Sequence, residues 1–280
     1  PASAPASETP ASAPEAAASA TTKPVAQPEA VEVRPLPSVD PAPPPPPAVV
    51  RPVPAPNTPY AGRDDVLRFA EELAAKQPQL PIEWLRDQLG QARFQASVAR
   101  LIMPPPAGVA KNWAAYRARF VETQRIEAGA AFWRNHADAL ARAEAQYGVP
   151  AHIVVGIVGV ETFYGRVLGT HRVLDALATL AFDFPTGRRD RTPFFRSELE
   201  AFLVWCAKEG RDPGAVRGSY AGAMGWPQFM PSSVLKYAVD FDRDGHIDLH
   251  NSMADVIGSV AHYMAAFGWQ RDLPTHFRVN

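Results

Sequence analysis

One acidic residue stands out in the apolar stretch 149–165, which reads VPAHIVVGIVGVETFYG. Glu161 is the only acid in this stretch, and small, apolar or aromatic residues surround it. A helix that begins after Pro150 places Ile157 four residues before Glu161, on the same face. We therefore expect Glu161 to face the protein core, where loss of hydration raises the pKa of a carboxyl group. A carboxyl group that keeps its proton near neutral pH can act as a general acid.

A structural role is the alternative for Glu161. Buried acids are usually paired, and Arg166 lies only five residues further on. Gly156 and Gly159 favour a functional role, because each glycine costs about 1 kcal/mol relative to alanine inside a helix. Their presence predicts that another backbone or a ligand approaches this helix closely. Residues 163–165, FYG, add aromatic surface at the end of the helix.

The second candidate stretch, 218–233, reads GSYAGAMGWPQFMPSS. Its three glycines and two prolines argue against one regular element, so we expect a loop. The loop supplies flat rings and polar groups, from Tyr220, Trp226, Phe229, Ser219 and Gln228. A sugar ring presents apolar faces and a rim of hydroxyl groups, so this combination suits a carbohydrate. A tightly packed loop is the alternative.

Acidic residues recur at every second position at the start of the stretch 240–248, DFDRDGHID. They are Asp240, Asp242 and Asp244. With glycine at position six, this spacing matches an EF-hand calcium loop, in which the residue at position seven, His246, offers its backbone carbonyl. Asn251 stands where the usual glutamate would be, so Asp255, on the following helix, is the nearest acid able to close the site. We predict bound calcium, with a solvated acidic turn as the alternative.

Helical patterns must position these stretches, and they follow one another from Tyr60 onward. We expect helices near 64–77, 81–90, 98–103, 111–147, 151–162, 174–180, 194–208 and 253–267. The region 111–147 is expected to form two helices broken near Gly129. Its aromatic residues Trp113, Tyr116 and Phe120 follow helical spacing and are expected in the core.

The N-terminal segment has a different composition. Residues 1–59 contain 18 of the 30 prolines, and most of the remaining residues are Ala, Ser, Thr, Glu and Val. We predict a disordered, partly polyproline-II tether, stiffest at 43–47, that can hold a domain at a distance from an anchor. A leader without a spacing role is the alternative.

Charge and cysteine content exclude several classes. The net charge of -1 and the pI of about 6.8 give no basic field, so we expect no nucleic-acid partner. Cys206 is the only cysteine, which rules out an internal disulfide, and its helical context predicts a small buried hydrophobe. No stretch approaches the roughly 18 apolar residues of a transmembrane helix.

Taken together, the motifs GVETFYG, GAMGWPQFMPSS and DFDRDGHID resemble, in this order, the lytic murein transglycosylase B family. The resemblance extends from about Arg63 to Trp269. It implies a mainly α, lysozyme-like catalytic domain at 60–280, with a helical subdomain at about 60–110, a core at about 111–280 and an EF-hand-like loop at 240–255. Family members continue beyond Trp269, so we expect this chain to be truncated at its C-terminus. The family is periplasmic and often lipid-anchored to the outer membrane, an arrangement that a tether at 1–59 and an anchor upstream of it would suit.

The resemblance also implies roles for individual residues. Glu161 matches the only catalytic acid of the family. Positions that line the sugar site match Ser219, Gln228, Tyr263 and Tyr116. The calcium loop corresponds to Asp240, Asp242, Asp244, the carbonyl of His246, and Asp255. We expect structural calcium and no organic cofactor.

The implied activity is cleavage of the β-1,4 bond between N-acetylmuramic acid and N-acetylglucosamine in the glycan strands of peptidoglycan, with formation of a 1,6-anhydro ring. One acid that later acts as a base suffices for this reaction. A hydrolytic muramidase is the nearest alternative and would usually need a second carboxylate, for which Asp175 or Asp183 is available. A non-catalytic peptidoglycan-binding scaffold is the other alternative. The sequence identifies no partner in cell-wall synthesis or division.

Overall fold

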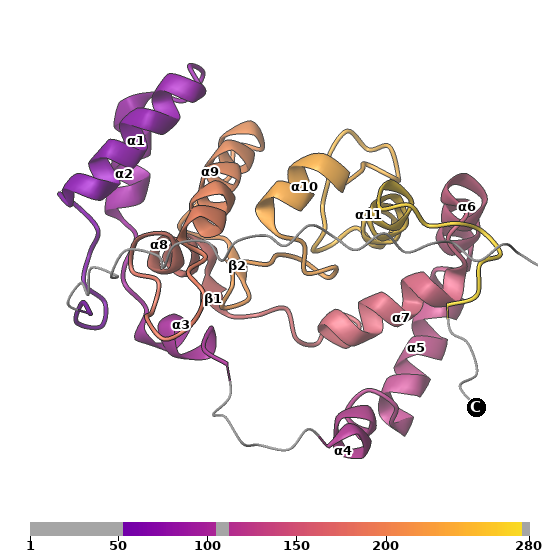
Figure 1. The fold of residues 1–280 in the computed structure, drawn as a ribbon. Coiled ribbons are helices and arrows are strands. Elements are labelled where there is room, and N and C mark those ends of the chain that lie inside the picture. The colour runs from indigo at the N-terminus through magenta and orange to yellow at the C-terminus, as the bar shows by residue number, and fades with distance from the viewer. Residues whose placement is uncertain (1–52, 105–111, 276–280) are drawn as a thin grey trace, which may run out of the picture. The chain divides into compact units, whose positions relative to one another are not determined.

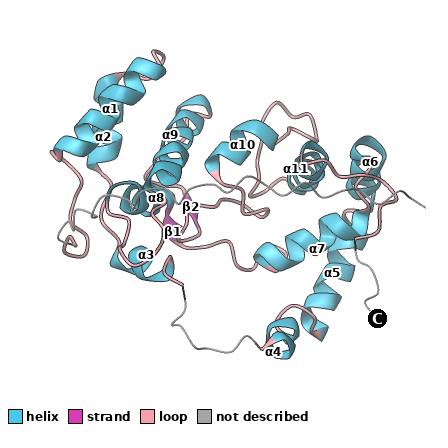
Figure 2. Cartoon of the chain, viewed as in Figure 1, coloured by secondary structure: helices cyan, strands magenta, loops and turns pink. Residues whose placement is uncertain are grey.

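A computed structural model of the protein describes residues 53–104 and 112–275, which are mainly helical, as predicted (Figures 1 and 2). The helices are α1 Asp64–Lys76, α2 Ile82–Gly90, α3 Ala96–Leu101, α4 Trp113–Ala118, α5 Thr123–Asn135, α6 Ala137–Tyr147, α7 Ala151–Thr162, α8 Val173–Phe182, α9 Thr192–Lys208, α10 Pro231–Tyr237 and α11 Met253–Ala266. Two short strands, β1 His171–Arg172 and β2 Arg217–Gly218, pair antiparallel with His171 opposite Gly218.

Most of the predicted tether, residues 1–52, lies outside the described residues. The part that is described is paired with the loop between α2 and α3. The backbone N–H of Asn57 donates to the carbonyl of Phe94 at 2.9 Å, and that of Tyr60 donates to the carbonyl of Ala92 at 3.0 Å. The chain therefore enters the helical region through a segment that contains a turn at 56–57 and is fixed by backbone hydrogen bonds.

A first core cluster joins the N-terminal helices to helices that come much later in the sequence. Buried apolar side chains of α1, α2 and α3 pack with those of α8 and α9. All ten residues of α8 are buried, because other elements cover it on every side. Met224 and Phe229, from the loop before α10, belong to the same cluster.

A second core cluster contains buried residues of α5, α6, α7 and α11, together with Phe241. In Figure 1, α7 lies against α5, and both belong to this cluster. Helix α7 carries the predicted acid. The catalytic candidate is therefore held by the second cluster, and the loop 218–229 is anchored partly in the first.

The region 111–147 differs from its prediction. In its described part, from residue 112, it forms three helices, and the chain breaks near 119–122 and at His136. Gly129 lies buried inside α5, where the hydroxyl of Tyr164 occupies the space that a methyl group would need. A glycine required for close packing was thus mistaken for a helix breaker.

The aromatic residues of α4 were wrongly expected in the core. Trp113 is 71% exposed and Tyr116 is 50% exposed, and α4 has no buried residue at all. The two rings stack on each other with centroids 5.7 Å apart, and Tyr116 contacts Phe120 at 5.0 Å. Helical spacing cannot distinguish rings that pack on a core from rings that pack only on one another.

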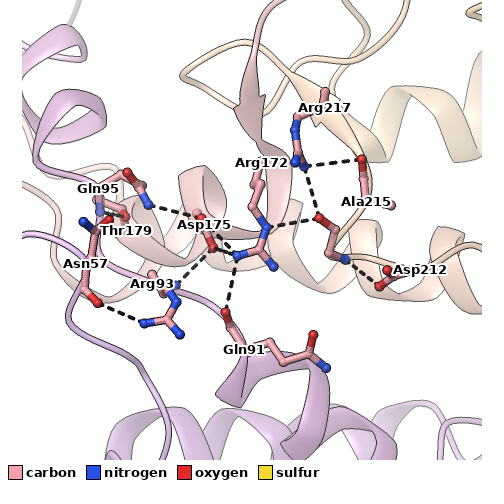
Figure 3. A network of polar contacts seen from close by, with 11 residues as sticks. Asn57, Gln91, Arg93, Gln95, Arg172, Asp175, Thr179, Asp212, Ala215 and Arg217 are labelled. Atoms are coloured by element: carbon pink, nitrogen blue, oxygen red, sulfur yellow. Dashed lines mark hydrogen bonds and ion pairs between the residues drawn. The ribbon is translucent and has the colours of Figure 1, made fainter.

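A buried polar network fastens the N-terminal region to α8 (Figure 3). Asp175, which is 3% exposed, accepts hydrogen bonds from the backbone N–H of Arg93 at 3.1 Å and from the side-chain amide of Gln95 at 3.2 Å. Arg172 forms an ion pair with Asp175 at 3.1 Å and donates to the carbonyl of Gly214 at 3.1 Å. One carboxylate thus holds segments from three parts of the sequence.

Two further predictions concern α9 and membrane insertion. Cys206 is fully buried, as predicted, and burial raises the pKa of its thiol to about 12. Among the helices that the structure describes, none has the length and apolar character needed to cross a membrane.

Candidate active site

Glu161 lies in the last turn of α7, which begins after Pro150 as predicted. The prediction that Glu161 faces the core is wrong. The buried face of α7 carries Val154, Val158 and Thr162, and Glu161, rotated by about 100° from Thr162, is exposed. Because α7 is apolar on nearly every side, its sequence pattern does not reveal which side is buried.

The environment of Glu161 suits an acid that holds its proton. Its carboxylate forms no hydrogen bond or ion pair with any residue in the described ranges. Partial desolvation by the surrounding protein raises the pKa of Glu161 above its ordinary value of 4.5. Arg166, the partner considered above, instead places its guanidinium group 4.5 Å from the ring centroid of Phe163. The structural alternative for Glu161 therefore loses its proposed partner.

The turn that follows α7 has an uncommon backbone. Phe163 and Tyr164 have φ angles of 50° and 53°, in the left-handed region that non-glycine residues rarely adopt. This turn directs Tyr164 back against α7, where its hydroxyl fills the space beside Gly159. The close approach predicted at Gly159 is thus made by a tyrosine side chain. At Gly156, no described atom lies within 4 Å of the position that a methyl group would take.

The segment after α7 is attached to the loop 218–229. The hydroxyl of Thr162 donates to the carbonyl of Trp226 at 3.1 Å, and the amide of Gln228 donates to the carbonyl of Leu168 at 3.4 Å. A methyl group at Gly165 would overlap the indole ring of Trp226. Thr162, the residue after Glu161, is therefore hydrogen-bonded to the loop predicted to hold a sugar.

Ser219 and Gln228 also fix the shape of that loop. The Ser219 hydroxyl oxygen accepts hydrogen bonds from the backbone N–H groups of Ala221 at 3.2 Å and Ala223 at 3.0 Å. The Gln228 amide donates to the carbonyl of Gly225 at 2.9 Å. Because Ser219 uses only its oxygen in these bonds, its hydroxyl proton remains able to donate to a ligand.

Tyr263, on α11, packs against the end of the loop 218–229. Its ring centroid lies 5.1 Å from that of Phe229, at the end of the loop, and 4.5 Å from that of Phe267. The ring is half-buried, so one part packs and another part remains accessible. The structure thus brings Glu161, Ser219, Gln228 and Tyr263 onto connected elements.

A row of stacked groups links Tyr116 to the same region. The guanidinium group of Arg125 lies 5.4 Å from the Phe120 ring centroid and 4.2 Å from that of Phe163, two residues beyond Glu161. Arg125 also donates to the carbonyl of Gly159 in α7. Sequence reasoning missed Arg125 and Phe163 as parts of this row, because no pattern distinguishes Arg125 from the other arginines.

The two acids considered for a hydrolytic mechanism are engaged elsewhere. Asp175 is bound in the network described above. Asp183 accepts from the hydroxyl of Tyr60 at 2.7 Å and forms an ion pair with Arg63 at 2.6 Å. Both carboxylates therefore bind segments of the first core cluster rather than the end of α7.

The acidic loop after α10 gathers three carboxylates. One oxygen from each of Asp240, Asp242 and Asp244 lies within 4.8 Å of the others. Desolvation raises the pKa of Asp240, but backbone hydrogen bonds, first among them that from Gly245, outweigh it and hold the pKa below its ordinary value. Three carboxyl groups gathered in one turn fit a hard cation such as calcium, which prefers oxygen ligands.

The other two predicted calcium ligands, Asp255 and His246, are not part of the three-carboxylate cluster. Asp255 is 1% exposed, and its oxygens accept hydrogen bonds from the backbone N–H groups of Phe241 at 2.7 Å and Asp248 at 2.8 Å. It lies outside the three-carboxylate cluster and braces the loop from α11. His246 is exposed, and its backbone N–H donates to Asp244 at 2.8 Å.

The mainly helical fold, with Glu161 exposed at the end of an apolar helix and without a partner among the described residues, agrees with the lysozyme-like domain that the resemblance implies. The family model of the transglycosylase SLT domain matches residues 63–280, a range that includes all eleven described helices. The chain therefore belongs to the transglycosylase SLT domain family.

Similar proteins agree with this assignment. The chain is 44% identical over 218 residues to the membrane-bound lytic murein transglycosylase B of Escherichia coli strain K12, a match that covers 75% of this chain and 59% of the relative. The soluble lytic transglycosylase SltB1 of Pseudomonas aeruginosa is 46% identical, with a TM-score of 0.70, over 75% of this chain and 69% of that one. The E. coli lytic transglycosylase Slt35, in complex with calcium, is 44% identical, with a TM-score of 0.69, over 76% of this chain and 66% of that one. The chain thus spans less than two thirds of the length of its curated relative.

Proposed function

We propose that the protein is a lytic transglycosylase that cleaves the β-1,4 bond between N-acetylmuramic acid and N-acetylglucosamine in peptidoglycan. The environment of Glu161 carries this proposal. Glu161 is exposed, has no partner among the described residues and has a raised pKa. The next residue, Thr162, is hydrogen-bonded to Trp226 in the loop 218–229. Membership of the transglycosylase SLT domain family and the names of the similar proteins support the same reaction.

In the proposed reaction, protonated Glu161 donates its proton to the glycosidic oxygen, and the bond to C1 of the muramic acid breaks. The neighbouring acetamido group stabilises the positive charge that develops at C1. Glu161, now a carboxylate, removes the proton of the C6 hydroxyl, whose oxygen attacks C1 and closes the 1,6-anhydro ring. The acid regains its proton, so the cycle is balanced without water or a second carboxylate.

The other proposed site residues hold the sugar. Ser219 offers a hydroxyl donor, and Gln228 offers an amide oxygen, because its nitrogen is committed to Gly225 and Leu168. Tyr263 and Tyr116 supply aromatic surface on which a sugar ring can stack. Arg125 has a positioning role, since it packs against Phe163 and donates to α7.

The hydrolytic alternative has weaker support. A hydrolase would usually need a second carboxylate about 5–10 Å from the first. Both acids considered for this role form ion pairs elsewhere, Asp175 with Arg172 and Asp183 with Arg63. The proposed reaction needs only the carboxyl group of Glu161.

The test is mass spectrometry of purified peptidoglycan after incubation with the protein and with Glu161→Gln. We expect 1,6-anhydro products from the parent and a loss of roughly 100- to 10,000-fold in the variant, because the amide cannot supply a proton. Glu127→Gln is the matched control, since Glu127 is an exposed acid on α5. Products with a reducing end would support the hydrolase. Full cellular function of Glu161→Gln would support the binding scaffold.

We also propose that calcium binds Asp240, Asp242 and Asp244, with the carbonyl of His246 as a further ligand and Asp255 bracing the loop. The geometry of the three carboxylates and the calcium complex of Slt35 support this. Because an ion that binds only the folded state stabilises it, millimolar calcium should raise the Tm of chelator-treated protein. Asp244→Ala should abolish the increase, and Asp87→Asn, an exposed acid on α2, should keep it. An equal increase in Asp244→Ala would disprove the site.

For the location, we propose the periplasm, with an anchor in the outer membrane reached through residues 1–59. The relative from E. coli is named membrane-bound, which supports this proposal. Fractionation of cells that express the natural gene should place the protein with the outer membrane. Recovery in the cytoplasmic fraction would contradict it.

A further inference from the structure

A groove with a volume of about 580 Å³ lies between α2 and the C-terminal end of α9. Its walls include Gln79, Trp84, Gln88, Arg211, Asp212 and Pro213. None of these residues belongs to the candidate active site, whose side chains come from α4, α7, α11 and the loop 218–229. The volume is within the range of sites for small ligands and is large enough for one or two sugar rings.

Both walls of the groove are fixed before any ligand binds. On one side, Trp84 and Gln88 are four residues apart on α2 and therefore share a face. On the other side, the backbone N–H of Arg211 donates to the carbonyl of Cys206 at 2.8 Å, and Asp212 accepts from the backbone N–H of Gly214 at 2.8 Å. A ligand would not need to order this turn, which lowers the entropic cost of binding.

The chemistry of the groove is mixed in a way that suits a carbohydrate. Trp84 offers a flat apolar ring, and the other lining residues include two glutamines, an arginine and an aspartate. The guanidinium group of Arg211 lies 5.4 Å from the ring centroid of Trp205. The Oε1 atom of Gln88 is buried and has no hydrogen-bond partner in the described structure. The torsion that orients this amide is broad, so a small rotation would present the oxygen to a hydroxyl or an N-acetyl N–H donor.

Other ligands fit the groove less well. Arg211 and Asp212 have opposite charges, so the groove offers no field that would select an anionic polymer. A peptide bound as an added strand needs an exposed strand edge, and the residues that line this groove come from helices and turns.

We propose that this groove is a second glycan-binding site, which takes one or two N-acetylhexosamine units apart from the catalytic acid. The inference rests on the proposed function, in which the substrate is a polymer with many equivalent units. Glycan held in the groove keeps the enzyme on the strand or on a neighbouring one, and so raises the effective substrate concentration at Glu161.

The experiment combines two readouts on the full chain. In the Glu161→Gln background, which binds without cleaving, the affinity for intact peptidoglycan sacculi is measured by co-sedimentation. We expect Trp84→Ala to lower this affinity about tenfold, as loss of one aromatic contact predicts. In the parent background, Trp84→Ala should lower cleavage of sacculi but leave kcat on a soluble N-acetylglucosamine–N-acetylmuramic acid tetrasaccharide unchanged.

Two further variants keep the test decisive. Trp84 packs partly against the first core cluster, so Gln79→Ala combined with Arg211→Ala, both at exposed positions, repeats the test with the Trp84 ring in place. Because the guanidinium group of Arg211 lies 5.4 Å from the ring centroid of the core residue Trp205, the Tm of the double variant is measured as well. Trp133→Ala, at an exposed tryptophan on α5, is the matched control. Parent-like sedimentation of the double variant, or an equal loss in Trp133→Ala, would overturn the proposal. Groove-dependent sedimentation without any anhydro product would refute the proposed reaction and leave the binding site standing.

Discussion

Glu161 combines two properties that rarely occur together in one side chain. It is exposed, so a substrate can reach it without movement of the core, and it is desolvated enough for its pKa to rise. The absence of a described hydrogen-bond partner keeps both of its oxygens available. A general acid needs access to the substrate and a pKa that is raised toward neutral pH, and this position at the end of α7 gives Glu161 access and a raised pKa.

The raised pKa of Glu161 predicts how activity changes with pH. The first step needs the protonated acid, so the rate should fall as pH rises through the pKa of Glu161, and this limb should lie above the ordinary value of 4.5. The stability of the fold should change with pH in the same direction. Because the pKa of Glu161 is higher in the folded than in the unfolded state, Glu161 stabilises the fold at low pH, and this stabilisation is lost as the pH rises through the folded-state pKa. The measurement is kcat/KM against pH on soluble tetrasaccharide, which reports the pKa of the free enzyme, and a falling limb centred at the ordinary value of 4.5 would contradict the assignment.

The sequence predicted the direction in which the pKa of Glu161 is shifted, but not the orientation of its side chain. Val160, the residue before Glu161, is 50% exposed, so apolar character in α7 does not mark burial. The side that faces the core is decided by α5, α6 and α11, which are separate elements of the chain. Arg125 was missed for a related reason, since its contact with Phe163 exists only after α5 and α7 have packed together.

Two glycines of α7 form a natural pair for an experiment on this element. Gly159→Ala should lower the free energy of unfolding by about 1–3 kcal/mol, because the added methyl group would overlap the hydroxyl of Tyr164. Gly156→Ala is the control, since no described atom lies within 4 Å of its added methyl group, and alanine should stabilise the helix by roughly 0.5–1 kcal/mol. Denaturant unfolding measures both, and equal effects of the same sign would contradict the packing described here.

Most helices were predicted from sequence, because prolines and periodic apolar positions mark them. The failures at α4 and Gly129 share a physical cause. Both were predicted from local spacing. Trp113 and Tyr116 have no core to pack on. At Gly129 only glycine leaves room for the hydroxyl of Tyr164, which lies 35 residues later in the sequence. The acidic loop was predicted from its spacing alone, and the structure brings three of its carboxylates together.

At the scale of the whole described region, Asp175 joins α8 to the loop between α2 and α3, and a substitution there tests how much this connection stabilises the fold. Asp175→Ala should lower the free energy of unfolding by about 3–5 kcal/mol, because it leaves Arg172 and two N–H donors without their buried partner. Asp87→Asn, at an exposed site on α2, should change it by no more than about 0.5 kcal/mol. The rate per folded molecule should stay unchanged in both variants. A loss of kcat in folded Asp175→Ala protein would instead favour the hydrolytic alternative.

The first core cluster has a consequence for how the protein is made. Tyr60 and Arg63 bind Asp183, which follows them by 123 and 120 residues, and Arg93 binds Asp175, 82 residues later. Helices α1 to α3 therefore leave the ribosome long before the partners that cover their apolar faces have been synthesised. Closing such distant contacts is slow, and exposed apolar surface invites aggregation in the meantime. The apolar faces of α1 to α3 thus stay uncovered until α8 and α9 have emerged.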